Sequence, residues 1–172
     1  MRVLVLNGPN LDRLGHREPA LYGRETLTEL EGALRRTASE LGIELRCIQS
    51  NHEGDLIEAL HAAADCDGII LNPAGYGHTS VALRDALLIA DRPTIEVHLT
   101  NLLRREPFRH HTLTADVAHG VISGLGTHGY HLALHALGRL LGAGSTPSTH
   151  QPPGGRPDEA GCTGEPRDLS TP

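Results

Sequence analysis

Short apolar runs alternate with helical patterns over the first 141 residues of the chain. The apolar runs predict five strands, at residues 2–6, 44–49, 68–71, 94–98 and 117–123. The intervening segments predict helices at 26–41, 55–64, 81–90 and 128–141. Strands and helices that alternate in this way are typical of βαβ units and a parallel sheet. The pattern therefore predicts an α/β fold, a doubly wound five-stranded parallel sheet with helices on both faces.

The composition changes sharply beyond Leu141. Residues 142–172 are rich in Gly, Pro, Ser and Thr and have few apolar side chains to bury. Such a segment cannot offset the entropy lost on ordering. We therefore predict one catalytic or binding domain over 1–141 and a disordered tail over 142–172. A partner-binding peptide is the alternative for the tail, although no helical or alternating pattern supports it.

Polar side chains follow three of the predicted strands. They are Asn10, Arg17 and Tyr22 after the first strand, residues 72–80 after the third, and Glu96, His98 and Thr100 at the end of the fourth. In a doubly wound sheet, ligands bind beyond the carboxyl ends of the strands, near the switch in strand order. We expect the functional site at this edge.

Arg17 and Tyr22 are a candidate catalytic pair. A free tyrosine has a pKa near ~10, so forming its phenolate at pH 7 costs roughly 4 kcal/mol. An arginine nearby lowers the pKa of an acidic group by about 1–3 units, which would suit a base. The chain contains no lysine, so a lysine Schiff base is excluded. From spacing alone, a tyrosine packed over the loop and an arginine paired with Glu18 is the stronger alternative.

Glu96 and His98 alternate along one strand and are predicted to project from the same face. A carboxylate beside an imidazole fixes the tautomer of the ring and favours its protonated form, which suits a general acid. The alternative is a pair that satisfies its hydrogen bonds at a strand end without a catalytic role.

Composition excludes several classes of partner and cofactor. The net charge of −6 argues against nucleic-acid and membrane-surface binding, although residues 104–111 are locally basic and suit an anion or solvent. No phosphate loop, Gly-x-Gly-x-x-Gly or His-Glu-x-x-His pattern occurs, so we expect no dinucleotide and no metal. Three scattered cysteines and no ~20-residue apolar run predict a protein of the reducing cytoplasm that does not enter a membrane.

Several segments closely resemble type II 3-dehydroquinate dehydratases, in the family's order and spacing over residues 1–141. The matching segments are Asn7–Leu11, Leu14–Pro19, Tyr22–Gly23, Gln49–Gly54, Asp67–Pro73, His78–Ala86, Ile95–His98, Phe108–His111 and Gly129–Tyr130. The resemblance implies a flavodoxin-like domain without a cofactor. It also implies removal of water from 3-dehydroquinate to give 3-dehydroshikimate, by anti elimination through an enolate, in the shikimate or quinate pathway. The lack of lysine agrees, because the unrelated type I enzymes use a lysine Schiff base.

The resemblance implies catalytic roles for five residues. Tyr22 would take the proton alpha to the ketone, and Arg17 would keep Tyr22 ionised. Asn10 would help hold a water against the enolate oxygen. His98, oriented by Glu96, would protonate the departing hydroxyl.

The same resemblance implies a set of substrate contacts. They fall on Asn72, His78, Asp85, Leu99, Thr100, Arg105 and Arg109. Asn72 and the N–H groups of residues 99 and 100 would bind the carboxylate, and His78 and Arg109 would hold ring hydroxyls. Arg105 would close over the site, while Asp85 would reach the site of a neighbouring subunit in a homo-oligomer, a trimer-based dodecamer.

Three positions depart from the family pattern, and two alternatives stay open. Asp12, Gly77 and Thr100 stand where Asn, Thr and Ser are usual, and Gly77 is expected to loosen the loop that presents His78. One alternative is a non-catalytic flavodoxin-like domain that binds a small molecule. The other is a metal-dependent hydrolase that draws its ligands from the pairs Glu96/His98, His52/Glu53 and His110/His111.

Overall fold

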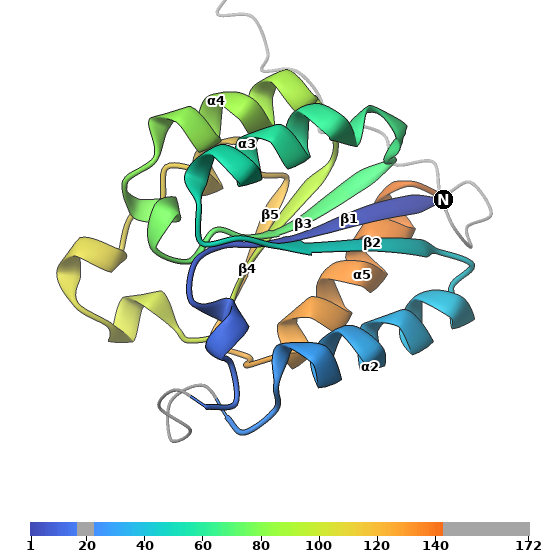
Figure 1. Ribbon diagram of the computed structural model, residues 1–172, viewed down its shortest axis with the longest axis horizontal. Coiled ribbons are helices and arrows are strands. Elements are labelled where there is room, and N and C mark those ends of the chain that lie inside the picture. Colours follow the sequence, from blue (N-terminus) through green and yellow to red (C-terminus); the bar gives the residue numbers. More distant parts are fainter. Residues whose placement is uncertain (17–22, 143–172) are drawn as a thin grey trace, which may run out of the picture.

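The structure, a computed structural model, describes residues 1–16 and 23–142 (Figure 1). Five parallel strands form one sheet in the order β2-β1-β3-β4-β5. The strands are β1 (Arg2–Asn7), β2 (Glu44–Gln49), β3 (Gly68–Asn72), β4 (Thr94–His98) and β5 (Gly120–Ser123). This order is that of flavodoxin-like sheets. The predicted fold class is confirmed, and the strand order switches between β1 and β3.

Helices cover both faces of the sheet (Figure 1). Helices α2 (Leu27–Glu40) and α5 (His128–Leu140) pack on one face, and α3 (Glu53–His61) and α4 (Val81–Ala90) on the other. Each face buries its own apolar cluster, because neighbouring strand residues point to opposite sides. Val3 and Val5 enter the α2/α5 cluster, whereas Leu4 and Leu6 enter the α3/α4 cluster.

Local signals in the sequence explain where two helices begin. Thr26 and Glu29 form the predicted capping box before α2, with each side chain accepting a hydrogen bond from the other residue's N–H. Gly42, just beyond α2, has a φ of 68°, a conformation that glycine adopts without strain. The Ser80 hydroxyl accepts a hydrogen bond from the Leu83 N–H at 2.8 Å and caps α4.

The connection between β4 and β5 contains only short 3₁₀ turns. They are η4 (Leu102–Arg104), η5 (Pro107–Arg109) and η6 (Ala115–Val117). The last turn corrects the predicted fifth strand, which begins at Gly120 and not at residue 117. The N–H of Val117 bonds to the carbonyl of Thr114, so this part of the chain is curled and not extended. Figure 1 shows η4 and η5 beyond the carboxyl ends of the strands.

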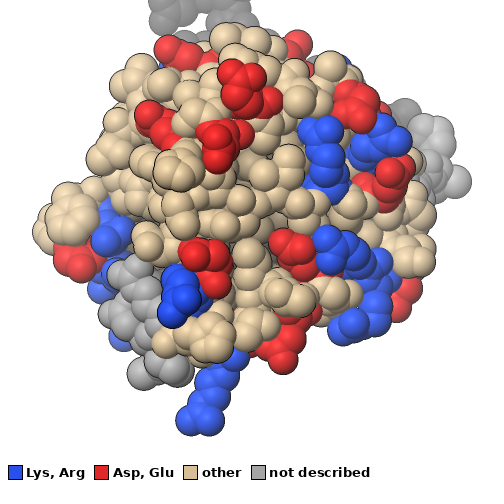
Figure 2. Space-filling model, in the orientation of Figure 1, with Lys and Arg blue, Asp and Glu red and all other residues tan. Residues whose placement is uncertain are grey.

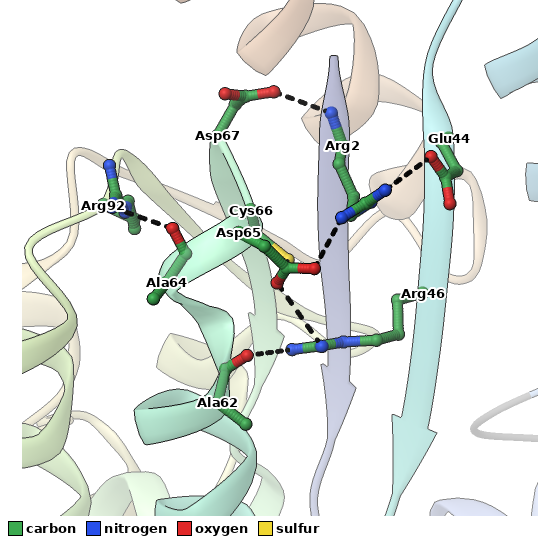
Figure 3. A network of polar contacts seen from close by, with 9 residues as sticks. All are labelled: Arg2, Glu44, Arg46, Ala62, Ala64, Asp65, Cys66, Asp67 and Arg92. Atoms are coloured by element: carbon green, nitrogen blue, oxygen red, sulfur yellow. Dashed lines mark hydrogen bonds and ion pairs between the residues drawn. The ribbon is translucent and has the colours of Figure 1, made fainter.

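A network of arginines and carboxylates lies at the opposite, amino end of the sheet (Figure 3). The Arg2 guanidinium pairs with Asp65 and with Glu44, and its backbone N–H donates to Asp67. Arg46 contacts the other oxygen of Asp65 at 3.5 Å. These contacts join β1 and β2 to the turn η2 (Ala62–Asp65) that precedes β3.

No helix among the described residues is long and apolar enough to cross a membrane. On the face of the molecule shown in Figure 2, arginine side chains lie beside acidic ones and form no continuous basic surface. Apart from its first residue, Gly142, the predicted tail over 142–172 lies outside the described residues.

Candidate active site

A cavity of about 200 Å³ opens at the carboxyl end of the sheet. Its walls come from the turn after β1, the loop after β3, the end of β4 and the β4–β5 connection. The described lining residues are Pro9, Asn10, Leu11, Arg13, Leu14, Asn72, Ala74, Gly75, His78, His98, Leu99, Thr100, Leu102, Arg105 and Arg109. Loops far apart in the sequence meet here because parallel strands end at the same edge.

Most of the predicted site residues are brought together in this cavity. Those that line it are Asn10, Asn72, His78, His98, Leu99, Thr100, Arg105 and Arg109. Glu96 lies directly behind His98. Arg17 and Tyr22 lie outside the described residues. Asp85 is on α4 and is not part of the described cavity lining.

His98 and Glu96 form a buried ion-pair geometry at the end of β4. The His98 Nε2 atom lies 2.6 Å from Glu96 Oε1, as expected for two residues on one face of a strand. Glu96 is fully buried and the His98 side chain is 5% exposed. Because a carboxylate only accepts hydrogen bonds, the His98 Nε2–H donates and Nδ1 is the ring atom available to a ligand. Glu96 Oε2 has no hydrogen-bond partner among the described residues.

A second histidine lies beside the first. The rings of His78 and His98 stack with their centroids 6.4 Å apart. His78 Nδ1–H donates to the carbonyl oxygen of His111 at 2.8 Å, which leaves Nε2 as its acceptor. The two imidazoles therefore present different ring nitrogens to the same cavity, each with its tautomer set by a fixed partner.

Asn10 has a left-handed backbone, with a φ of 66°. Its N–H donates to Asn51 Oδ1 at 2.7 Å, and Gln49 Nε2 donates to the same oxygen at 3.2 Å. The Tyr76 hydroxyl donates to the Asn51 backbone carbonyl at 2.9 Å. Asn51 thus supports the turn that carries Asn10 into the cavity.

Three arginines line the cavity, and no acidic residue does so among the described lining residues. The arginines are Arg13, Arg105 and Arg109. Glu106 lies next to two of them, 3.4 Å from Arg105 Nε and 3.0 Å from Arg109 Nε. A hydrogen bond to its own backbone N–H, together with these arginines, lowers the pKa of the Glu106 carboxyl. In a chain of net charge −6, this concentration of guanidinium groups favours an anionic ligand.

The segment around Gly77 is tightly packed. Gly77 is buried, and its carbonyl oxygen accepts a hydrogen bond from the Leu113 N–H at 2.7 Å. A Cβ atom at this position would lie 2.8 Å from Pro73 Cγ. Close packing against Pro73 does not support the expectation that Gly77 loosens the loop before His78.

The described residues contain no group of three or more His, Cys, Asp or Glu side chains placed to hold a metal ion. The histidine and carboxylate pairs considered in the sequence do not converge. His98 and Glu96 bond to each other, while His110 Nε2 donates to the Arg105 carbonyl oxygen.

Comparison with known proteins identifies the family. A family model described as Dehydroquinase class II matches residues 1–138. The chain belongs to this family. A 3-dehydroquinate dehydratase of Jannaschia sp. (strain CCS1) is 49% identical over 148 residues, which cover 86% of this chain and 100% of that protein. A 3-dehydroquinate dehydratase 2 of Pseudomonas putida is 54% identical and covers 81% of this chain and 94% of its own length. The crystal structure of a type II dehydroquinase from Butyrivibrio crossotus aligns with a TM-score of 0.78 and 43% identity, over 80% of this chain and 97% of that one.

The structure also brings residues to the site that the sequence did not single out. Arg13 lines the cavity, Asn51 supports Asn10, and the Tyr130 hydroxyl bonds to both Asn72 and Asn7. Asn51 and Tyr130 fall in segments that resemble the family, so their segments were visible in the sequence. Their contacts were not, because each partner is more than 40 residues away.

Proposed function

We propose that this chain is a 3-dehydroquinate dehydratase that removes water from 3-dehydroquinate to give 3-dehydroshikimate, in the shikimate or quinate pathway. The observation that carries the proposal is the cavity itself, which is lined by three arginines and by His98, whose ring bonds to the buried Glu96. The substrate carries a carboxylate, which the arginines of the cavity would attract. Its dehydration also needs proton transfer, for which His98 offers an acid. The family relationship gives the substrate.

Elimination begins with removal of the proton alpha to the ketone. Tyr22 is the base, Arg17 stabilises its phenolate, and Asn10 holds a water against the enolate oxygen. The enolate needs donors placed in advance, because its charge appears only during the reaction. The fixed backbone of Asn10, tied to Asn51 at 2.7 Å, supports this role.

The tyrosines that the structure describes, Tyr76 and Tyr130, are poor candidates for the base. Tyr130 is completely buried, and burial raises the pKa of its hydroxyl well above the ordinary value, so it stays protonated. The Tyr76 hydroxyl donates its proton to the Asn51 carbonyl oxygen. The chain has three tyrosines, so Tyr22 is the remaining candidate.

His98 then protonates the departing hydroxyl. Its Nε2–H donates to Glu96 Oε1 over 2.6 Å, which fixes the orientation of the ring. An acid and a base on opposite sides of the ring give the anti elimination. No metal or cofactor takes part.

The substrate is held by groups on three loops. Asn72 and the backbone N–H groups of Leu99 and Thr100 bind the carboxylate, while His78 and Arg109 bind ring hydroxyls. Arg105, whose Nη1 donates to the Thr100 hydroxyl at 3.2 Å, closes over the site. All of these residues line the cavity, which supports their assignment.

A homo-oligomer, a trimer-based dodecamer, completes the proposal. The Asp85 side chain is 58% exposed on α4 and is not among the described residues that line this chain's own cavity. Val81, Leu88 and Ile89 are 59%, 53% and 70% exposed at helical spacing around it. This apolar helix face suits a second copy of the chain, into whose site Asp85 would reach. Sedimentation velocity of Ile89→Asp, against wild type, tests the assembly.

The domain and the location complete the assignment. Residues 1–141 form the catalytic domain, supported by the family match over 1–138. The free thiols of Cys47 and Cys66 suit the reducing cytoplasm.

The decisive experiment follows the ultraviolet absorbance of the conjugated enone product. Wild-type protein should turn over 3-dehydroquinate, and exhaustive chelation should leave the rate unchanged. Tyr22→Phe should lower turnover by about 10²-fold or more, while substrate binding by calorimetry persists. No rise in absorbance with micromolar wild-type protein would instead favour a non-catalytic binding domain.

A further inference from the structure

A buried hydrogen-bonded chain lies directly behind the cavity. Tyr130, on α5, is the largest of the fully buried side chains that the structure describes. Its hydroxyl lies 2.6 Å from Asn7 Oδ1 and 2.9 Å from Asn72 Nδ2. Asn7 and Asn72 are paired in register at the ends of β1 and β3, where the strand order switches. Of these three residues, only Asn72 is among the described lining of the cavity.

The contacts of Asn72 determine which group donates and which accepts in the hydrogen bonds that join Asn72, Tyr130 and Asn7. Asn72 Oδ1 accepts a hydrogen bond from the Ala74 N–H at 3.2 Å, so the amide nitrogen must face Tyr130. The Tyr130 oxygen therefore accepts a hydrogen bond from Asn72 Nδ2–H, and the Tyr130 O–H donates a hydrogen bond to Asn7 Oδ1. A tyrosine hydroxyl has only one proton, so the arrangement is polarised in one direction.

We propose that Tyr130 is a positioning residue that fixes the amide orientation of Asn72 and thereby sets the affinity for the substrate. Asn72 Nδ2 carries two N–H groups, and Tyr130 holds one of them. The other is left to bind an acceptor in the cavity. The inference rests on the proposed contact between Asn72 and the substrate carboxylate, and it adds a residue that touches no substrate itself.

The environment of Tyr130 suits a fixed orientation. Tyr130 belongs, with Val97 and Ala133, to the buried apolar cluster between the sheet and α2/α5. Burial raises the pKa of its hydroxyl, so the hydroxyl keeps the proton with which it bonds to Asn7. Without the hydroxyl, Asn7 Oδ1 and one N–H of Asn72 would lose their partners, and the Asn72 amide could rotate.

Steady-state kinetics of Tyr130→Phe test the inference. The substitution removes one oxygen atom, and we expect KM to rise about tenfold, while kcat changes by less than about threefold, as for lost uniform binding. Leu134→Val is the matched control, because Leu134 is buried on the same helix in the same cluster. It should lower the unfolding midpoint but leave KM unchanged.

A double-mutant cycle separates positioning from general damage to the fold. In an Asn72→Ala background, Tyr130→Phe should have no further effect on KM. Asn7→Ala removes the acceptor of the Tyr130 O–H and should also raise KM. This second variant tests the inference if Tyr130→Phe folds poorly.

Two outcomes would overturn the inference. An unchanged KM in Tyr130→Phe, with a lower unfolding midpoint, would make Tyr130 purely structural. An equal rise in KM with and without Asn72 would mean that Tyr130 acts through another group. Either result would leave the dehydratase activity standing, whereas an inactive wild-type protein would remove the proposed function itself.

Discussion

The two ends of the sheet use similar polar side chains in opposite ways. At the amino end, Arg2 pairs with Asp65 and Glu44, whose side chains are 51% and 69% exposed (Figure 3). At the carboxyl end, Glu96 and His98 form a pair that is almost completely buried. The first network ties chain segments together in contact with water. The second holds the His98 imidazole at the edge of a cavity.

This difference in burial indicates that the exposed pairs and the buried pair have different roles. Exposed ion pairs are screened by water and contribute little each. Burial of an ion pair carries a desolvation penalty that can exceed the attraction between the two groups, so it is weak evidence for stability. The buried pair is therefore better explained by chemistry than by folding. Changes at the carboxyl end should reduce turnover, and changes at the amino end should affect only stability.

The largest effect is expected for His98. His98→Ala should lower turnover by about 10²-fold or more, as for loss of a general acid, with a much smaller change in substrate binding. His98→Gln should lose as much, although its amide can still donate to Glu96. The enone assay and calorimetry measure both quantities.

His61→Ala is the matched control for His98, because His61 is an exposed histidine at the end of α3. It should retain wild-type turnover. A loss of His98→Ala that appears only in binding would contradict its role as the acid.

A smaller but clear effect is expected for Glu96. Glu96→Gln keeps the shape of the side chain but replaces the charged acceptor of the His98 Nε2–H with a neutral amide. Turnover should fall by at least about tenfold with little change in KM, measured by steady-state kinetics. Glu58→Gln, at an exposed position of α3, should be indistinguishable from wild type. Wild-type turnover in Glu96→Gln would show that the buried pair is structural.

Ser80 tests whether every polar residue near the cavity is functional. Its hydroxyl caps α4 and is buried, so Ser80→Ala should lower the free energy of unfolding by about 1 kcal/mol. Denaturant titration measures this loss. Ser39→Ala, at an exposed position inside α2, should show no loss, since alanine favours helix. Equal stability of the two variants would mean that the cap contributes nothing.

The smallest effect is expected at the amino end. The hydrogen bond from Arg2, with the charges of Arg2 and Arg46, lowers the pKa of the Asp65 carboxyl. Its folded-state pKa is below its unfolded value, so its stabilisation is present above the unfolded pKa and is lost as pH falls through the folded one.

Asp65→Asn should therefore lower the unfolding midpoint slightly at pH 7, and the difference should begin to shrink below about pH 4 and be lost once the pH is below the lowered folded-state pKa. Thermal unfolding across this range tests the prediction, with turnover unchanged at pH 7. Glu40→Gln, outside the network at the end of α2, is the control. A difference that persists in acid would exclude the ion pairs as its cause.

The sequence predicted elements more accurately where local signals were strong. The bounds of α4 and of β2 and β4 agree with the prediction residue for residue, because caps and apolar runs mark them. The fifth strand was overextended, since Val117 is apolar but belongs to a 3₁₀ turn. An apolar residue that anchors a turn cannot be distinguished by type from one in a strand.

By itself, the sequence determined the α/β class, the edge where the polar loops end and the residues that resemble the family. These properties follow from periodicity and from residue type along a continuous segment. The tertiary structure decided that Arg13 joins the cavity, that Asp85 stays apart from it and that Tyr130 bonds to Asn7 across 123 residues. Such contacts depend on how helices and strands pack together, which the spacing of residues along the chain does not determine.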